Sequence, residues 1–297
     1  MDVNAKPTSS VSAIVERAGA PLPVDVDIVI PVYNEQAEIG SSVMTVVERM
    51  RVLARERVDC TWQVVIADNA SIDDTWFVAL SLVRAFPDEV RAVRIDRKGR
   101  GFALKQAWGF SQAQVLAYMD VDLSTDLAHL TELIGPILSG RVDVAFGSRL
   151  MPASRVTRSL KRECISRTYN RMLQAYLGVR FHDAQCGFKA LSMEAASLLL
   201  PCVADDEWFF DTELLYLSER AGLATLEIPV RWVEDPGSTV HIVDTVRKDL
   251  AGMRRLKRGA ASGSGMRSEP AQSAVPPFDG ECVDRLRPVD RGEVDAR

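Results

Sequence analysis

Two aspartates, Asp120 and Asp122, stand one residue apart directly after the apolar run that ends at Met119. Because strand side chains repeat with a period of two, both carboxylates are expected to point to the same side. Two converging carboxylates repel each other unless a cation lies between them, and oxygen ligands of this kind suit Mg2+ or Mn2+. The pair is therefore a candidate metal site. The competing interpretation is that these acids only cap a helix starting near Leu123.

Polar residues also follow two other predicted strands, and a glycine loop precedes a predicted helix. The motif PVYNE ends at Glu35, and Asp68 lies near the end of the strand expected in WQVVIADN. In KGRGFALKQA, Gly99 and Gly101 flank Arg100, which lets the backbone approach a phosphate closely while the cation and the helix N-terminus attract it. The loop is not a Walker A motif, and an ordinary glycine turn is the alternative interpretation.

A run rich in arginine follows in the second half of the chain. Between residues 149 and 171, seven cations stand against the single acid Glu163: Arg149, Arg155, Arg158, Lys161, Arg162, Arg167 and Arg171. Since a guanidinium group can bind phosphate with two parallel hydrogen bonds, a phosphate is expected here, at Arg149 first and at Arg162 and Arg167 next. The alternative is a solvated helix face on which some arginines form salt bridges.

These residues need a scaffold that brings strand ends together. Short apolar runs alternate with amphipathic stretches, which predicts an α/β fold with a Rossmann-like, mainly parallel sheet and helices on both faces. Ligands of such sheets gather at the carboxyl ends of the strands. The expected strands lie over 26–33, 62–69, 90–95 and 115–122, and the expected helices over 38–54, 73–86 and 101–113.

The amino-acid composition excludes several classes of protein. The 297 residues, 47% of them hydrophobic, carry a net charge of -5, which excludes a generally basic protein that coats nucleic acid. The five cysteines form no CxxC pair, so neither a disulfide framework nor a zinc site is predicted. No window resembles a membrane span or a signal peptide, so we expect a cytoplasmic protein, soluble or peripheral. Residues 1–24 are expected to form a flexible arm, 25–258 a single domain and 259–297 a disordered tail.

A basic amphipathic helix is expected over residues 243–258. Its polar face carries six cations against two acids. The apolar residues that fall near one stripe are Val243, Val246, Leu250, Met253 and Leu256. Such a helix can lie on an anionic membrane with its apolar side down. It can equally pack on the domain and leave its charges in water.

The motifs taken in order carry a resemblance. PVYNE, ADNASIDDT, KGRGFALKQAW and MDVDLS resemble the nucleotide-sugar domain of family 2 glycosyltransferases, which are inverting enzymes with a GT-A fold. AFGSRL, DAQCGFKAL, WFFDTELLYLSERAG and IPVRWVEDPGST are similar to dolichyl-phosphate β-glucosyltransferases and, less closely, to dolichol- or polyprenol-phosphate mannose synthases. The resemblance implies a nucleotide-sugar half over 25–123 and an acceptor half, including the basic helix, over 124–258.

The resemblance also implies roles on the donor side. The residues concerned are Pro31, Tyr33 and Glu35 at the nucleobase, Asp68 at the base or ribose, Arg100 at the phosphates, and Asp120 and Asp122 on the divalent ion that bridges the diphosphate. Arg100 stands in a Gly-Arg-Gly loop where the family usually has Gly-Lys-Gly, and it keeps the positive charge. Asn69 in DNAS, where the family more often has DDGS, leaves the choice between uridine and guanosine open.

On the acceptor side the resemblance places Asp183, Gln185 and Lys189 along the sugar or acceptor cleft, besides Arg149, Arg162 and Arg167. The catalytic residues it implies are Asp122, Asp211 and Arg149. Asp211 is expected to orient sugar or acceptor, or to act as base where the acceptor is a hydroxyl. Asp211 and Glu213 are two residues apart on a predicted helix, so only one of them should face the site.

The function expected from these motifs is inverting transfer of a hexose, glucose ahead of mannose, from UDP-glucose or GDP-mannose to a polyprenyl or dolichyl phosphate. A lipid phosphate is already an anion and needs no strong base, whereas the alternative, a hydroxyl acceptor, needs one. A catalytically inactive nucleotide-sugar-binding homologue is the non-enzymatic alternative, which the intact Asp120, Asp122 and Arg149 oppose. The partners expected are the nucleotide sugar, the lipid phosphate and the cytoplasmic face of a membrane, without nucleic acid.

Overall fold

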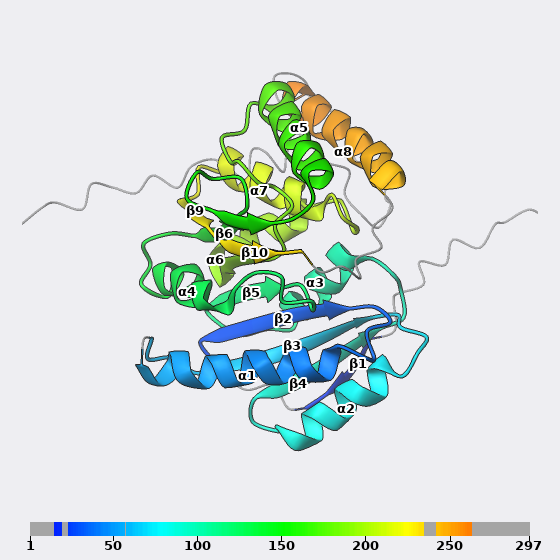
Figure 1. Cartoon of the computed structure of the whole chain (residues 1–297), viewed down its shortest axis with the longest axis vertical. Helices are drawn as coiled ribbons and strands as arrows, with labels where there is room; N and C mark the ends of the chain where they lie inside the picture. The colour runs from blue at the N-terminus through cyan, green and yellow to red at the C-terminus, as the bar shows by residue number, and fades with distance from the viewer. Residues whose placement is uncertain (1–14, 20–22, 57, 235–241, 263–297) are drawn as a thin grey trace, which may run out of the picture.

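The computed structural model describes residues 15–19, 23–56, 58–234 and 242–262, and they form a helix-covered sheet (Figure 1). The strands lie in the order β1-β4-β3-β2-β5-β8-β6-β9. β1 and β8 run antiparallel to their neighbours, whereas the other pairings are parallel. The strands are β1 (Val15–Ala18), β2 (Val26–Val32), β3 (Trp62–Asn69), β4 (Val90–Ile95), β5 (Val115–Met119), β6 (Val144–Ser148), β8 (Phe188–Ser192) and β9 (Thr225–Pro229).

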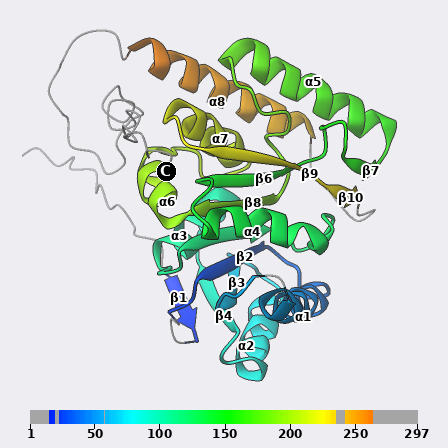
Figure 2. The ribbon, with the colours of Figure 1, turned by 90° about the vertical axis from the view of Figure 1, so that its left-hand side faces the viewer.

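Helices cover both faces of this sheet, as the sequence predicts (Figures 1 and 2). One apolar cluster packs against the face covered by α1 (Ile39–Glu56), α2 (Thr75–Ala85) and α4 (Leu130–Leu138). A second cluster packs against the face covered by α3 (Arg100–Gly109), α5 (Leu160–Leu177), α6 (Met193–Leu199), α7 (Phe210–Arg220) and α8 (Ile242–Ser262). The central strands are buried on both faces, so they read as continuous apolar runs rather than as alternating ones.

The chain turns directly after β5, and this turn carries the two aspartates. β5 ends at Met119, and Leu123 in the turn has a φ of 49°. Asp126 then caps the short 3-10 helix η1 (Leu127–His129) by accepting a hydrogen bond from the N–H of Ala128 at 2.9 Å. The expectation that the strand continues through Asp122 is therefore wrong. The helix cap is Asp126, so Asp120 and Asp122 are not needed for capping.

β8 returns to the middle of the sheet between β5 and β6 and joins the two halves of the chain. The N–H of Asp120 donates to the carbonyl of Gly187 at 3.1 Å, just before β8 begins. A Cβ added at Gly187 would lie 1.7 Å from Oδ2 of Asp120, so a side chain cannot be accommodated without moving the carboxylate. This close approach requires glycine and fixes the distance between Asp120 and β8.

A second, two-stranded sheet stands beside the turn after β5. It pairs β7 (Arg155–Thr157) with β10 (Arg231–Val233) in parallel. Backbone hydrogen bonds tie β10 to the turn, from Asp126 N to Arg231 O at 3.0 Å and from Val233 N to Ser124 O at 2.9 Å. The pairing spans more than 70 residues of sequence, and no local pattern in the sequence predicted it.

Helix α5 begins next to this small sheet. Ser159 caps it by accepting a hydrogen bond from the N–H of Arg162, and Gly178 ends it in the left-handed conformation with a φ of 74°. The cap fixes where the helix starts, so Leu160 and Lys161 form its first turn at the exposed end of β7.

Two expectations from the sequence need correction outside the main sheet. Residues Val15–Ala18, expected in a flexible arm, form β1 against the edge of β4. Cys60, Cys164 and Cys186 are free thiols, whereas Cys202, which lies in the 3-10 helix η2 (Leu200–Cys202), is disulfide-bonded. Residues 259–262, expected in the disordered tail, belong to α8. The rest of that tail and the expected arm before residue 15 lie outside the described residues.

The predicted basic helix near the end is α8, and its apolar side packs on the domain. Met253 and Leu256 are buried in the second cluster, and Leu250 packs against it. Cations such as Arg254 and Lys257 stay exposed. Over 247–259, the part whose side chains are described, the membrane interpretation of the apolar stripe is therefore wrong and the packing interpretation is right. Among the described helices, none combines the length and the hydropathy needed to cross a bilayer.

Candidate active site

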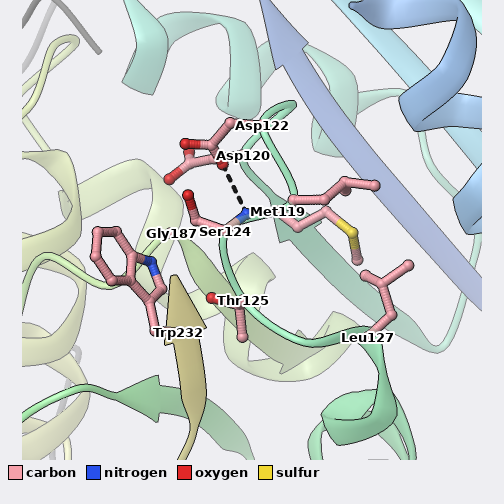
Figure 3. Close-up of a pocket in the computed structure, with 9 residues that line it drawn as sticks. Met119, Asp120, Asp122, Ser124, Thr125, Leu127, Gly187 and Trp232 are labelled. Carbon is pink, nitrogen blue, oxygen red and sulfur yellow. Dashed lines mark hydrogen bonds between the residues drawn. The ribbon is translucent and has the colours of Figure 1, made fainter. Parts of the chain in front are cut away.

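A pocket with about 210 Å3 of open space lies at the carboxyl end of β5 (Figure 3). It is lined by Met119, Asp120, Asp122, Leu123, Ser124, Thr125, Leu127, Gly187 and Trp232. Figure 3 shows the two aspartates and Trp232 around the same space, with Trp232 contributed by β10. The structure thus confirms that Asp120 and Asp122 meet at one site, although a turn rather than strand periodicity brings them together.

The donor set at this pocket fits a hard divalent cation. Asp120 keeps 43% of its side chain exposed, and Asp122 is exposed beside it. The described residues contain no group of three His, Cys, Asp or Glu that could enclose a metal. Two carboxylates with the remaining positions left to substrate phosphates and water are the way in which Mg2+ is commonly bound. Asp120 and Asp122 would therefore hold the ion together with a bound diphosphate.

Arg100 lies behind Asp120 and bridges it to α7. Its guanidinium is 9% exposed and donates to Oδ1 of Asp120 at 2.7 Å and to Oδ2 of Asp211 at 2.5 Å. Burial favours the neutral form, but the charges of Asp120 and Asp211 outweigh it and raise the pKa of Arg100 well above its ordinary value. In this structure Arg100 orients the pocket carboxylate of Asp120, whereas the sequence resemblance implied a place for Arg100 at the donor phosphates.

Asp211 is enclosed by donors on both of its oxygens. Tyr118 donates its hydroxyl hydrogen to Oδ1, and Nζ of Lys189 lies 3.1 Å from the same oxygen. Lys189 is fully buried and also donates to the hydroxyl of Tyr118 at 3.2 Å and to the carbonyl of Cys186 at 2.6 Å. Lys189 therefore does not line an open cleft, contrary to the expectation from the sequence.

The surroundings of Asp211 decide its protonation. Burial alone would raise the pKa of Asp211, but the charges of Lys189 and Arg100 and the hydrogen bond from Tyr118 outweigh burial and hold the pKa below its ordinary value. A general base works best with a pKa near the operating pH and a free lone pair aimed at substrate. Asp211 has neither, so we assign it a positioning role rather than the base role considered from the sequence.

Glu213 faces away from this network. It pairs with Arg255 of α8 at 2.8 Å and accepts a hydrogen bond from the N–H of Asp205 at 2.7 Å. The prediction that only one of Asp211 and Glu213 faces the site is confirmed. Gln185, expected in the cleft, also turns toward α8, where its side-chain amide contacts Asp249 at 3.4 Å.

Arg149 and Asp183 form a second buried pair beside the pocket. Nε and Nη2 of Arg149 donate to the two oxygens of Asp183 at 2.7 and 2.9 Å, and the backbone N–H of Arg149 adds a third bond. Asp183 is fully buried, so it does not line the cleft as expected. The guanidinium lies 5.5 Å from the ring centroid of Trp232, and the pair thereby supports the pocket wall.

Replacing Asp183 with Asn is expected to lower the free energy of unfolding by about 2 kcal/mol at neutral pH. Burial raises the pKa of Asp183, but Arg149 outweighs it and lowers the pKa from 3.8 to about 2. The stability from this shift is fully present above the unfolded pKa and is lost as the pH falls through about 2. Urea unfolding from neutral to acidic pH should show the two proteins converging. Curves that stay parallel would contradict the prediction.

The expected donor residues lie at the ends of β2 and β3. Asp68 is fully buried, and its Oδ1 accepts from Ser71 N at 3.0 Å, while Oδ2 has no hydrogen-bond partner in the described part of the chain. Nε of Arg94 lies 3.7 Å from Oδ2, so this oxygen forms an ion pair rather than a hydrogen bond. Pro31, Tyr33 and Glu35 are half-buried beside it.

Hydrogen bonds join the glycine loop to these strand ends. Oδ1 of Asn69 accepts the backbone N–H of Gly99 at 2.8 Å, and Nζ of Lys98 lies 3.6 Å from the ring centroid of Tyr33. The asparagine that departs from the family pattern therefore has a structural partner. It anchors the loop that carries Arg100.

Arg162 and Arg167 do not reach the pocket. Arg162 pairs with Glu234 at 2.5 Å, and Arg167 pairs with Glu163 one turn earlier on α5. The interpretation as a partly salt-bridged helix face is right for both residues. These ion pairs do not support an acceptor role for either residue, whereas Arg149 contacts the pocket residue Trp232.

Three residues at the site were not predicted from the sequence. Tyr118 stands two residues before Asp120 in a strand, so the period of two could have placed it on the same side. Trp232 offered no such signal. Trp208 is 47% exposed, with its ring centroid 5.1 Å from the guanidinium carbon of Arg100.

Comparison with known proteins identifies the chain's family. Residues 27–199, more than half of the chain, match the sequence profile of Glycosyl transferase family 2. The chain belongs to glycosyl transferase family 2. The order of motifs noted in the sequence therefore reflects membership, and the sheet described above is the GT-A fold of this family.

The chain aligns with a small part of one relative and with most of two others. It is 39% identical over 249 residues to the glycosyltransferase AglD of Haloferax volcanii. The aligned residues make up 84% of this chain but only 38% of AglD. It is 27% identical to the dolichyl-phosphate β-glucosyltransferase of Saccharomyces cerevisiae, over 76% of this chain and 73% of the relative. The human dolichyl-phosphate β-glucosyltransferase is 28% identical over 71% of this chain and 68% of the relative.

Solved structures share the fold of this glycosyltransferase. Glucosyl-3-phosphoglycerate synthase from Mycobacterium tuberculosis in complex with UDP superimposes with a TM-score of 0.57 at 20% identity, over 86% of this chain and 91% of that one. The complex of the same synthase with Mn2+, UDP-glucose and phosphoglyceric acid gives 0.52 at 16% identity, over 91% and 82%. At these identities the likeness establishes the fold.

Proposed function

We propose that this glycosyltransferase transfers glucose, with inversion, from UDP-glucose to a polyprenyl or dolichyl phosphate in the presence of Mg2+ or Mn2+. The dolichyl-phosphate β-glucosyltransferases among its relatives support the acceptor and the sugar, because each of the two described above is matched over more than two thirds of its length. The fold shared with a synthase crystallised with Mn2+ and UDP-glucose supports the donor and a divalent ion.

The observation that carries the choice of acceptor is the state of Asp211. Transfer to a hydroxyl requires a base to remove a proton, whereas a lipid phosphate attacks as an anion. Arg100 links the buried Asp211 to Asp120, and three side-chain donors contact the oxygens of Asp211. A site whose enclosed carboxylate is held ionised by three donors suits an acceptor that brings its own negative charge.

The roles of the chain's residues follow from their positions. A divalent ion bound by Asp120 and Asp122 would stabilise the charge that develops on the leaving diphosphate. Arg100 holds Asp120 in orientation, Asp211 holds Arg100 from behind, and Tyr118 and Lys189 hold Asp211.

Other contacts shape the rest of the proposed site. Trp232, supported by Arg149 and Asp183, closes one side of the pocket against water. Asp68, which forms an ion pair with Arg94 at 3.7 Å, would lie at the ribose or base of the donor.

A matrix of donors and acceptors tests this proposal. Purified protein with Mn2+ or Mg2+ is given UDP-glucose or GDP-mannose, and a short polyprenyl phosphate or a free sugar, in detergent micelles. We expect glycolipid only with UDP-glucose and polyprenyl phosphate, detected together with stoichiometric release of UDP. Transfer to the free sugar without glycolipid would favour the hydroxyl-acceptor enzyme. Binding of UDP-glucose without turnover on any acceptor would favour an inactive homologue.

A further inference from the structure

The small sheet and the first turn of α5 present an exposed apolar pair. Side chains alternate on β10, so Trp232 points inward to the pocket while Val233 is 55% exposed. Leu160, at the start of α5, is 88% exposed. Large aliphatic side chains at such exposure cost free energy in water unless a partner covers them, and contiguous exposed apolar residues mark interaction surfaces.

Hydrogen bonds hold these two apolar side chains on neighbouring segments. The N–H of Ser159 donates to Oε2 of Glu234 at 3.0 Å, and Arg162 pairs with the other oxygen of Glu234 at 2.5 Å. Leu160 lies within the segment from 159 to 162, and Val233 directly precedes Glu234. Figure 2 shows β7, β10 and the start of α5 on the same side of the molecule.

Cations lie on β7, β10 and the first turn of α5, the segments around the pair. Arg155 and Arg231 are register partners across β7 and β10, and like charges placed opposite one another repel. Asp126 neutralises Arg231 at 2.9 Å. The exposed side chains of Arg155 and Lys161 make no hydrogen bond or ion pair within the described residues. We name the residues Arg155, Leu160, Lys161 and Val233 the β7–α5 patch.

We propose that the β7–α5 patch is the surface by which this glycosyltransferase seats on an anionic membrane. Leu160 and Val233 would enter the headgroup boundary, and Arg155 and Lys161 would meet lipid phosphates. The inference rests on the proposed lipid acceptor and deepens it, because Val233 adjoins Trp232 in the pocket wall. A lipid phosphate that reaches the pocket past Trp232 leaves its isoprenoid tail beside the patch. The apolar stripe of α8, by contrast, is covered by the domain where it is described.

Vesicle co-flotation of the full chain, without donor or acceptor, tests the patch. The vesicles contain either phosphatidylcholine alone or phosphatidylcholine with phosphatidylglycerol. We expect stronger binding to the anionic vesicles, weakening as salt is raised. The variant Arg155→Gln with Lys161→Gln should bind anionic vesicles about 25-fold more weakly, about fivefold for each cation. The variant Leu160→Ser with Val233→Thr should bind both kinds of vesicle about tenfold more weakly.

A matched control comes from α2, at the lower end of the molecule in Figure 1, which carries an exposed aromatic residue and an exposed cation. Phe77 is 66% exposed and Arg84 is exposed on the same helix. The variant Phe77→Ser with Arg84→Gln removes the same kinds of group and should leave vesicle binding unchanged. Thermal unfolding of all variants should match the parent chain, since the substituted side chains are exposed.

The outcomes separate the patch from the proposed function. If the two patch variants form glycolipid in micelles but no longer bind vesicles, the proposed function and the membrane role of the patch are both supported. Unchanged vesicle binding in the patch variants, or an equal loss in the α2 control, overturns the membrane role whatever the micelle assay shows. A patch that joins two copies instead would appear as a dimer in light scattering that the Leu160→Ser variant dissociates, and this result also overturns the proposal. If the parent chain forms no glycolipid but binds vesicles through the patch, only the proposed lipid-phosphate acceptor is contradicted.

Discussion

Replacing Asp122 with Asn is expected to lower glycosyl transfer by about a hundredfold to a thousandfold while leaving the fold intact. The change removes one of the two pocket carboxylates that would hold the ion, and losing one preorganised electrostatic stabiliser typically has an effect of this size. Asp122 is exposed, so its loss should shift thermal unfolding little. Calorimetric titration of Mn2+ in the presence of UDP provides a readout independent of turnover, and we expect binding to weaken at least tenfold.

A control for this prediction lies four residues further along the chain. Asp126→Asn removes the same charge but keeps the helix cap, since asparagine caps as well as aspartate. Asp126 does not line the pocket, so transfer in micelles and Mn2+ binding should stay within about twofold of the parent. Equal losses in both variants would mean that overall negative charge, rather than the aspartate pair, governs the reaction.

Replacing Asp211 with Asn is expected to lower the free energy of unfolding by about 3 to 5 kcal/mol, because it leaves Arg100 and Lys189 as buried cations with less compensation. Transfer to polyprenyl phosphate by the protein that remains folded should fall only about tenfold, through looser positioning of Asp120. A general base in this position would predict a loss of about a hundredfold to ten thousandfold and a missing acidic limb in the pH–rate profile. Chemical unfolding and the pH profile together discriminate the two roles.

Glu213→Gln is the matched control on the same helix. Glu213 is also buried against an arginine, Arg255, but it faces α8 instead of the pocket. We expect the variant to change stability and to leave the turnover of folded protein unchanged. If Asp211→Asn were inactive with undiminished stability, the positioning role assigned to Asp211 would be wrong, and the hydroxyl-acceptor enzyme would regain support.

Much of the sheet could be predicted because its strands are buried on both faces. Apolar residues make up most of the runs at 62–69 and 90–95, and the structure places β3 and β4 over the same residues. The prediction failed at the end of β5, where a turn stops the strand three residues before Asp122. The N–H of Leu123 donates to the carbonyl of Asp120 at 3.3 Å, and Leu123 has a φ of 49°, which is rare for leucine and therefore not predictable from its residue type.

The carboxylates of the site could be predicted, but the network behind them could not. Asp120 and Asp122 can be recognised in the sequence because they are acids that directly follow an apolar run. Tyr118 reads as an ordinary core residue, and Lys189 was expected in an open cleft. The two are register partners in the antiparallel pairing of β5 with β8, and the local pattern of either segment carries no information about that pairing.

The stretch by which the family is recognised is shorter than the unit that folds. It ends at residue 199, before α7 supplies Asp211 and before β9 covers the outer side of β6. A fragment cut at that boundary would keep Arg100 and Lys189 in the interior without the carboxylate that balances both, and it would expose the hydrogen-bonding edge of β6. Asp120 therefore depends, through Arg100, on a carboxylate that the chain contributes only after the matched stretch has ended.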